Sequence, residues 1–214
     1  MQTMIELREI TLNAGKSTLL KKCSFHMQEG EKWVLCGPSG CGKSSLLKSI
    51  IGLFPIASGS ILVDGIACQP ETISTLRARI AFVGQEPIMG AEKVRDALLL
   101  PFSFKAHRKQ LPDSKAISQQ LHRLRLSDDI LEKSVRQISG GEKQRIAVAR
   151  ALLLGKKIFL ADETTSALDP ASREAVMDEL FSKETTLLSV SHDPIWMERC
   201  QKTLHFKNAQ LGEA

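Results

Sequence analysis

The chain has 214 residues, of which 43% are hydrophobic and 25% charged, and its formal net charge is +5. This composition is ordinary for a globular protein, and the length suits one domain with or without a smaller lobe. No apolar run approaches the roughly 20 residues that cross a bilayer, and the N-terminus does not resemble a secretory signal. Aromatic residues make up 5% and tyrosine is absent, so the modest basic excess gives little support for nucleic-acid binding.

The N-terminal third of the chain reads as strands and turns. Apolar and polar residues alternate over Ile5–Leu12, which predicts a strand, and Trp33–Cys36 is a continuous apolar run. Residues 61–63 lie between two glycine turns and predict a hairpin strand. A buried strand is expected over Arg79–Gly84. The five cysteines form no C-x-x-C pair, which predicts reduced thiols in a cytosolic protein.

The rest of the chain alternates helices with apolar strands. Residues 92–137 have a helical pattern, in which Ser127 is a suitable helix start. Two apolar runs have the composition of central parallel strands, and two helices alternate with them. These four elements are Ile158–Ala161, Thr186–Val190, Gly141–Leu154 and Pro170–Phe181. Residues 1–214 are therefore expected to form one α/β unit with a helical insertion and no linker.

Two stretches compete as a phosphate-binding loop, which requires G-x-x-x-x-G-K-[ST] between a strand and a helix. In the first, Gly15-Lys16-Ser17, the leading glycine should fall at position 10, where Ile10 lies within a strand pattern. A β-branched residue does not adopt the backbone angles that point successive N–H groups at an anion. Gly15-Lys16-Ser17 is therefore predicted to be a hairpin turn.

The second stretch, G-P-S-G-C-G-K-S-S, meets every requirement, because an apolar strand precedes it and a helix pattern follows. The helix N-terminus adds a favourable field for anions. Lys43 is expected to reach the β- and γ-phosphates of ATP, and the Ser44 hydroxyl is expected to ligate Mg²⁺. The predicted nucleotide-binding residues are Gly37, Pro38, Ser39, Gly40, Cys41, Gly42, Lys43, Ser44 and Ser45.

Two carboxylates end the apolar run that begins at Ile158. The strand places Asp162 at the carboxyl edge of the sheet, where it can hold Mg²⁺. Glu163 is the candidate to orient and deprotonate a water that attacks the γ-phosphate. The chain has no N-K-x-D motif, which counts against a GTPase.

The stretch I-S-G-G-E-K-Q-R-I-A-V-A-R-A-L, residues 138–152, resembles the signature of ABC-type ATPases. Gln85 in V-G-Q-E-P resembles the Q-loop of that family, residues 166–169 its D-loop, and His192 in S-V-S-H-D its switch histidine. The resemblance covers the chain to about residue 206. It implies a P-loop NTPase core of the ABC ATPase type, with an N-terminal antiparallel β subdomain and a small helical subdomain at about 87–137.

The resemblance also implies a head-to-tail homodimer that encloses two ATP molecules with Mg²⁺. Ser139, Gly140 and Gly141 of one subunit would face the γ-phosphate held by the other, and glycines let backbone N–H groups approach an anion closely. Asp169 of the D-loop is assigned to the same nucleotide interface. Gln85 would sense both Mg²⁺ and the helical lobe, and His192 would contact the γ-phosphate as a catalytic residue alongside Glu163.

Two departures from the family pattern stand out. The fifth signature position is Glu142 in place of glutamine, and Ser139-x-x-Glu142 also forms a capping box, so we expect Glu142 to bond the Ser139 N–H and turn away from the phosphate. No aromatic residue follows the first strand, where the family stacks one on adenine. This absence predicts modest ATP affinity and weak discrimination between bases.

With no spanning segment in the sequence, the resemblance implies a transporter ATPase that drives a separate permease at the cytoplasmic face of the inner membrane. The helical subdomain would dock on that permease, and the apolar run Leu98–Phe102 and the basic run Lys105–Lys109 suit a partner near a phospholipid surface. Soluble mechanical ATPases that act on nucleic acid or ribosomes are an alternative. So are force-transmitting ATPases of lipoprotein release or cell division.

Within the family, the chain is similar to the compact ATPases of iron-export systems. That similarity lies in G-P-S-G-C-G-K-S, in the stretch P-I-M-G-A-E-K-V-R-D-A-L-L-L-P-F, and in L-S-D-D-I-L before the signature. Cysteines and histidines show no ligand spacing for iron. Iron export is therefore implied by the resemblance alone, and substrate choice would reside in the permease.

Overall fold

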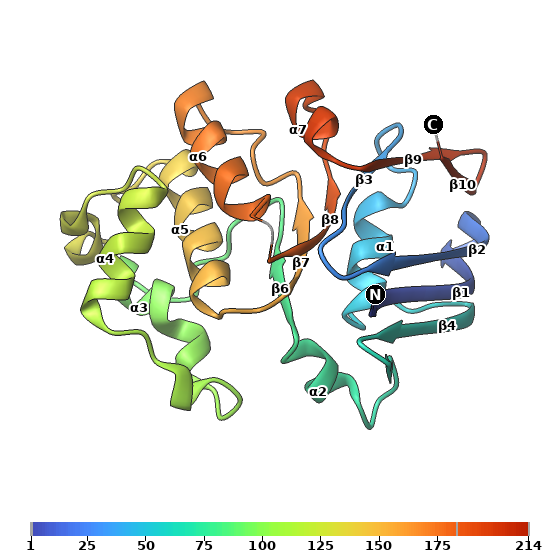
Figure 1. Ribbon diagram of the computed structural model, residues 1–214, viewed down its shortest axis with the longest axis horizontal. Coiled ribbons are helices and arrows are strands. Elements are labelled where there is room, and N and C mark those ends of the chain that lie inside the picture. The colour runs from blue at the N-terminus through green and yellow to red at the C-terminus, as the bar shows by residue number, and fades with distance from the viewer. Residues whose placement is uncertain (1, 183, 214) are drawn as a thin grey trace.

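The computed structural model describes residues 2–182 and 184–213. They form two β-sheets with helices packed between and beside them (Figure 1). None of the described helices combines the length and hydropathy needed to cross a bilayer. The predicted α/β class is confirmed.

The first sheet has the strand order β2-β1-β4-β5 and is antiparallel throughout. Its longest strands, β1 and β2, are joined by Gly15 and Lys16, which confirms the predicted hairpin turn. Gly15 adopts a φ of 59°, a conformation that glycine reaches without strain. The four strands are β1 (Thr3–Ala14), β2 (Ser17–Gln28), β4 (Ser58–Val63) and β5 (Ile66–Ala67).

The second sheet has the order β10-β9-β3-β8-β7-β6 and is parallel except for β10. Every residue of β3, β7 and β8 is buried, as their apolar sequences predict for central strands. Their carboxyl ends meet at one edge of the sheet. The strands are β3 (Lys32–Cys36), β6 (Ile80–Val83), β7 (Ile158–Asp162), β8 (Thr186–Val190), β9 (Lys202–Lys207) and β10 (Gln210–Glu213).

Helices cover both faces of the second sheet. Helix α1 lies between the two sheets and buries Leu46, Leu47 and Ile50 there, whereas α5 and α6 pack on the opposite face. The chain thus has a helix-sheet-helix arrangement with the first sheet outside α1. The helices are α1 (Lys43–Ile50), α2 (Ile73–Arg77), α5 (Gly140–Leu153), α6 (Pro170–Leu180) and α7 (Pro194–Arg199).

The segment between β6 and α5 is helical, as expected, but it is broken into short pieces. Asp113 caps α4 by accepting a hydrogen bond from the Ala116 N–H. Ser127 instead precedes a short 3₁₀-helix, and its hydroxyl bonds Asp129 rather than the backbone. The pieces are α3 (Val94–Leu99), η1 (Leu100–Ser103), η2 (Arg108–Gln110), α4 (Ser114–Arg123) and η3 (Asp128–Glu132).

One expectation about this segment is wrong. Leu98 and Phe102 were expected to face a partner, yet their exposed fractions are 0% and 3%. Leu98 packs in the core with residues of α4 and α5, because the lobe is small and needs these side chains for its own interior. The basic run that follows them, Lys105–Lys109, lies at the surface except for the half-buried His107.

Candidate nucleotide site

The phosphate-binding loop joins the buried end of β3 to the start of α1. Gly42 has a φ of 110°, and a Cβ atom added there would lie 2.9 Å from the Leu19 Cβ. Gly37 has a φ of 146°, and an added Cβ would lie 2.9 Å from the Phe206 Cβ. Both glycines are therefore required by backbone angle and by space, which explains the spacing of the motif.

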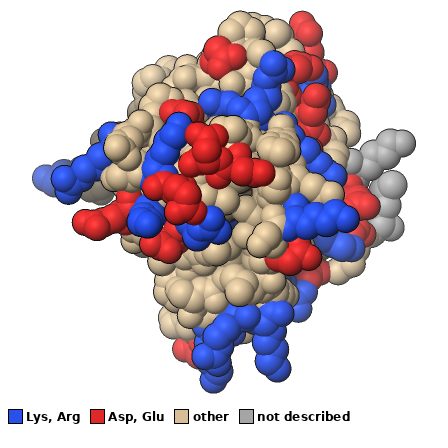
Figure 2. Space-filling model, turned by 90° about the vertical axis from the view of Figure 1, so that its left-hand side faces the viewer, with Lys and Arg blue, Asp and Glu red and all other residues tan. Residues whose placement is uncertain are grey.

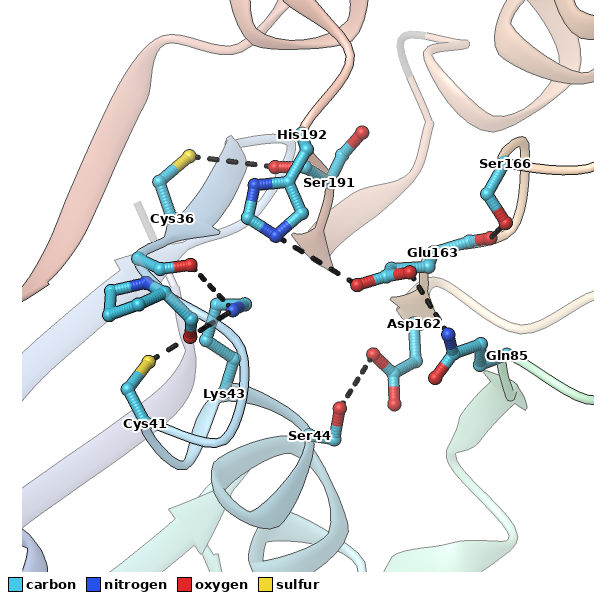
Figure 3. Close-up of polar contacts among 12 residues, drawn as sticks. Cys36, Cys41, Lys43, Ser44, Gln85, Asp162, Glu163, Ser166, Ser191 and His192 are labelled. Atoms are coloured by element: carbon cyan, nitrogen blue, oxygen red, sulfur yellow. Dashed lines mark hydrogen bonds and ion pairs between the residues drawn. The ribbon is translucent and has the colours of Figure 1, made fainter.

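The start of α1 is open to an anion. Gly42 is its N-cap residue and provides no side-chain hydrogen bond to the first turn. The Lys43 ammonium folds over the loop and donates to the carbonyl oxygens of Gly37 (2.7 Å) and Pro38 (2.9 Å) (Figure 3). Uncapped N–H groups beside a lysine form a suitable cradle for phosphate oxygens.

Asp162 ends β7 and faces the same loop. Its Oδ1 accepts a hydrogen bond of 2.9 Å from the Ser44 hydroxyl, and Asp162 is only 2% exposed. Burial raises the pKa of the Asp162 carboxyl, the Ser44 bond opposes that shift, and the neighbouring charge of Glu163 adds to it. A charge is thus held out of water where a cation would stabilise it.

The raised pKa predicts that Asp162 destabilises the nucleotide-free protein. Between the ordinary pKa of 3.8 and the raised value, the folded state binds more protons than the unfolded state, so stability falls as the pH rises through that window. Asp162→Asn removes this loss. We expect its melting temperature to exceed that of the wild type at neutral pH by about 2–4 °C, or about 1 kcal/mol. The difference should shrink as the pH falls towards 3.8.

Thermal melts from pH 3.5 to pH 7.5 without nucleotide would check this expectation. Asp178→Asn is a matched control, because Asp178 lies on the surface of α6 in an ion pair with Arg199. A wild-type advantage at neutral pH in the absence of Mg²⁺ would contradict the prediction.

Glu163 follows Asp162 in an unusual backbone conformation. Its φ is 48°, a left-handed value that costs a non-glycine residue about 1–2 kcal/mol. The turn is held by hydrogen bonds from the Glu163 N–H to the Val190 carbonyl and from the Ser166 hydroxyl to the Glu163 carbonyl. The chain therefore bends sharply after β7 and turns the Glu163 carboxylate towards the loop rather than into the sheet.

Two further predicted residues meet this carboxylate. The Gln85 Nε2 donates to Glu163 Oε2 at 3.0 Å, and the His192 Nε2 lies 3.9 Å from Glu163 Oε1 (Figure 3). Gln85 follows β6, and His192 follows β8, so three strand ends deliver these groups to one place. Strained backbone and converging polar groups are typical of functional sites.

A hollow of about 350 Å³ lies in front of these residues. Ser44 and Gln85 line this hollow, and Asp162 is hydrogen-bonded to Ser44. Their hydroxyl, amide and carboxylate oxygens are ligands of the kind that a hard cation such as Mg²⁺ prefers. The described residues that line the hollow are Ser39, Gly40, Gly42, Lys43, Ser44, Ser45, Gln85 and Glu163.

The signature residues do not line that hollow. Ser139 caps α5 and forms the expected capping box: its hydroxyl accepts from the Glu142 N–H at 3.2 Å, and the Glu142 carboxylate accepts from the Ser139 N–H at 2.7 Å. The backbone bond to Ser139 holds the pKa of Glu142 below its usual value. Glu142 is thus turned back onto the helix end, as predicted.

Because its carboxylate is committed to this cap, Glu142→Gln should leave nucleotide affinity within about twofold, since a glutamine amide oxygen also completes a capping box. Titration of the purified variant with a fluorescent ATP analogue checks the value. Glu142→Ala serves as the comparison and should destabilise the helix start by about 1 kcal/mol. A tenfold gain in affinity for Glu142→Gln would mean that the carboxylate faces the phosphate.

Asp169 also has a structural role, as the N-cap residue of α6. Its Oδ1 accepts from the Ser172 N–H at 3.0 Å and caps α6. Hydrogen bonding to the side chain and then to the backbone of Ser172 lowers the pKa of Asp169. Within one chain Asp169 does not line the nucleotide hollow.

The five cysteines carry free thiols, and the part of the chain that the structure describes contains no group of three His, Cys, Asp or Glu residues able to hold a metal.

Comparison with known proteins agrees with this geometry. A family model described as ABC transporter matches residues 20–166, which is more than half of the chain. The chain belongs to the ABC transporter family. It is an ATP-binding protein and an ATPase of that family.

Among its relatives, this ABC transporter ATPase is 33% identical over 210 residues to the probable iron export ATP-binding protein FetA of Escherichia coli (strain K12), with coverage of 94% of this chain and 90% of the relative. It is 36% identical over 196 residues to the glutamate/aspartate import ATP-binding protein GltL of the same organism, with coverage of 89% and 81%. The dimeric ATP-binding cassette MJ0796 bound to ADP and Pi is similar in structure, with a TM-score of 0.83, 27% identity and coverage of 99% and 98%.

Sequence reasoning missed two residues of the ABC signature helix that hold the Q-loop. The Gln144 Nε2 donates to the Gly84 carbonyl at 3.4 Å, and the Arg150 guanidinium donates to the carbonyl oxygens of Ile88 (2.9 Å) and Met89 (3.3 Å). The Q-R and A-R pairs after the signature marked these positions. Their partners are backbone atoms on another element, which a sequence pattern does not reveal.

Proposed function

We propose that two copies of this chain associate head to tail around two ATP molecules with Mg²⁺, and that ATP hydrolysis drives a separate membrane permease. The single observation that carries the proposal is the division of the site. One chain gathers the phosphate loop, Gln85 and Glu163 at one hollow, with Asp162 hydrogen-bonded to Ser44 of that loop, whereas its signature lies outside the hollow.

The start of α5 is suited to complete a partner's site. The capping box satisfies the N–H groups of Ser139 and Glu142. Among the described contacts, no side chain bonds the N–H groups of Gly140 and Gly141, and a Cβ added at Gly140 would meet nothing within 4 Å. Two open N–H groups at a helix N-terminus favour an anion such as the γ-phosphate of a second subunit's ATP.

The residues beside the phosphate loop fit the hydrolytic step. Glu163 would orient the attacking water and accept its proton, and Gln85 holds the Glu163 carboxylate in place through its Nε2. His192 would contact the γ-phosphate from the end of β8. Lys43 would exchange the loop carbonyls for phosphate oxygens. Mg²⁺, held by Ser44, Asp162 and Gln85, would neutralise charge that develops on the phosphates.

The transport role rests on the named relatives, whose names give different cargoes. FetA is named for iron export and GltL for glutamate and aspartate import. Since similar ATPases serve such different cargoes, substrate choice would lie in the permease. We propose metal export, with iron as the first cargo to test. The helical subdomain at about 87–137 would dock on the permease at the cytoplasmic face of the inner membrane.

A trapped variant tests the proposal. Affinity-tagged Glu163→Gln would be expressed in the native host, loaded with ATP and Mg²⁺, and purified from gently solubilised membranes. Stoichiometric recovery of a multi-span membrane protein is the expected result, and metal transport by the pair would then be measured in vesicles. Recovery of ribosomes or nucleic acid without a membrane protein would overturn it.

A further inference from the structure

A basic surface with exposed apolar side chains lies at one edge of the helical subdomain. Phe104 and Leu111 are 59% and 60% exposed, and Lys105, Arg108 and Lys109 lie between them at the surface. The segment forms the loop below α3 in Figure 1, and Lys and Arg side chains project from the lower end of the same face in Figure 2. We call these five residues, together with Lys156, the basic edge.

The cations of the basic edge have no acidic neighbours along the chain. Residues 97–112 contain no Asp or Glu. Among the ion pairs of the described residues, none involves Lys105, Arg108, Lys109 or Lys156. Acidic side chains gather instead in the middle of the face shown in Figure 2. The positive charge of the edge is therefore available to an external anion.

Lys156 adds a cation from a different element. It lies in the loop that joins α5 to β7, and its Nζ is 3.4 Å from the Nδ1 of His107. Burial lowers the pKa of Lys156, and burial followed by the charge of Lys156 lowers the pKa of His107. The neutral His107 ring accepts from the Lys156 ammonium at this distance, so the contact holds the Lys156 charge beside the basic run.

The basic edge and the signature lie at opposite ends of α5. The signature occupies the N-terminus of this 14-residue helix, and Lys156 follows its C-terminus. A helix of that length spans about 21 Å. A partner bound at the basic edge would therefore leave the signature uncovered.

We propose that the basic edge contacts an anionic phospholipid bilayer directly. Each Lys or Arg near an anionic membrane surface strengthens partitioning about fivefold, and an exposed phenylalanine and leucine beside the charges would enter the headgroup region. These apolar side chains favour a bilayer over nucleic acid, whose phosphates would use the cations alone. This contact needs no permease, so it goes beyond the proposed function and does not depend on it.

Vesicle co-sedimentation of the purified full chain tests the contact. We expect binding to vesicles with 30% phosphatidylglycerol, negligible binding to pure phosphatidylcholine, and weaker binding as salt increases. The triple variant Lys105→Gln/Arg108→Gln/Lys109→Gln should lose roughly a hundredfold in partitioning. The double variant Phe104→Ser/Leu111→Ser should lose roughly tenfold and leave the salt dependence in place.

The matched control is Lys21→Gln/Lys22→Gln/Lys207→Gln, which removes three exposed charges from β2 and β9. It should bind the anionic vesicles like the wild type, and the ATPase rate of every variant reports its folding. Equal losses in the two triple variants, equal binding to neutral vesicles, or no binding at low salt would each overturn the proposal. Co-purification of a permease despite any of these results would leave the proposed function standing.

Discussion

Glu163→Gln is expected to lower the rate of ATP hydrolysis by about 10²-fold to 10⁴-fold, the range typical of the loss of a general base. The amide cannot accept the proton of the attacking water. It can still accept the hydrogen bond from the Gln85 Nε2, so the turn after β7 should keep its geometry. ATP binding, which depends on the phosphate loop and Ser44, should remain within a few-fold of the wild type.

A binding-competent subunit that does not hydrolyse ATP should accumulate as a dimer. Steady-state hydrolysis, ATP titration and size-exclusion chromatography at high protein concentration measure the three effects separately. Glu174→Gln is the control, since it removes a carboxylate that pairs with Arg199 on the surface of α6. Its hydrolysis rate should match the wild type. A Glu163→Gln variant that keeps more than a tenth of the wild-type rate would exclude Glu163 as the base.

The parts of this site that the sequence predicted are those that local backbone chemistry determines. The glycine spacing of the phosphate loop follows from positive φ values at Gly37 and Gly42, and Ile10 excluded the competing stretch. The apolar run of β7 placed Asp162 at the carboxyl edge of the sheet, whereas His192 was identified by resemblance and lies after the neighbouring parallel strand β8. Ser139-x-x-Glu142 predicted its own hydrogen bonds, since both partners lie within one helical turn.

The parts that sequence reasoning missed depend on contacts between distant segments. Phe102 reads as an apolar residue beside a basic run, and only the packing of the lobe shows that it is buried. The hairpin of β9 and β10 turns at Asn208 and Ala209 without the glycine of the strongest hairpin signals, and its strand β9 pairs with β3. His107 and Lys156 lie 49 residues apart in sequence. In each case a tertiary contact decides the outcome, and local propensity does not encode it.

Arg150 gives the second large prediction, because it links the signature helix to the Q-loop. Its guanidinium donates to the carbonyl oxygens of Ile88, Met89 and Ala97 at 2.9, 3.3 and 3.3 Å, and it forms no ion pair among the described residues. Burial lowers the pKa of Arg150, so its charge is costly and only these carbonyl groups offset that cost. Ile88, the first of these three residues, follows Gln85 by three positions in the sequence.

We expect Arg150→Met to destabilise the protein by about 2–3 kcal/mol. Three hydrogen bonds to a charged donor contribute about 1.5–3 kcal/mol each, and removal of the buried charge offsets much of that sum. The melting temperature should fall by about 4–12 °C. Hydrolysis should fall by up to about 10²-fold, because a shift of the loop by about 1 Å would misplace Gln85 against Glu163.

Two variants separate this role from a loss of charge or of packing. Arg150→Lys keeps the charge but not the planar fork, so it should recover part of the stability and less of the hydrolysis rate. Arg95→Met, on α3, removes an exposed ion pair with Glu132 of η3 and should change stability by no more than about 1 kcal/mol. If Arg150→Met lowers the melting temperature but leaves the hydrolysis rate of the folded protein unchanged, Arg150 supports the lobe without positioning Gln85. If both fall and Arg150→Lys recovers stability first, the fork itself holds the Q-loop, and movement of the helical subdomain would reach Glu163 through these carbonyl groups.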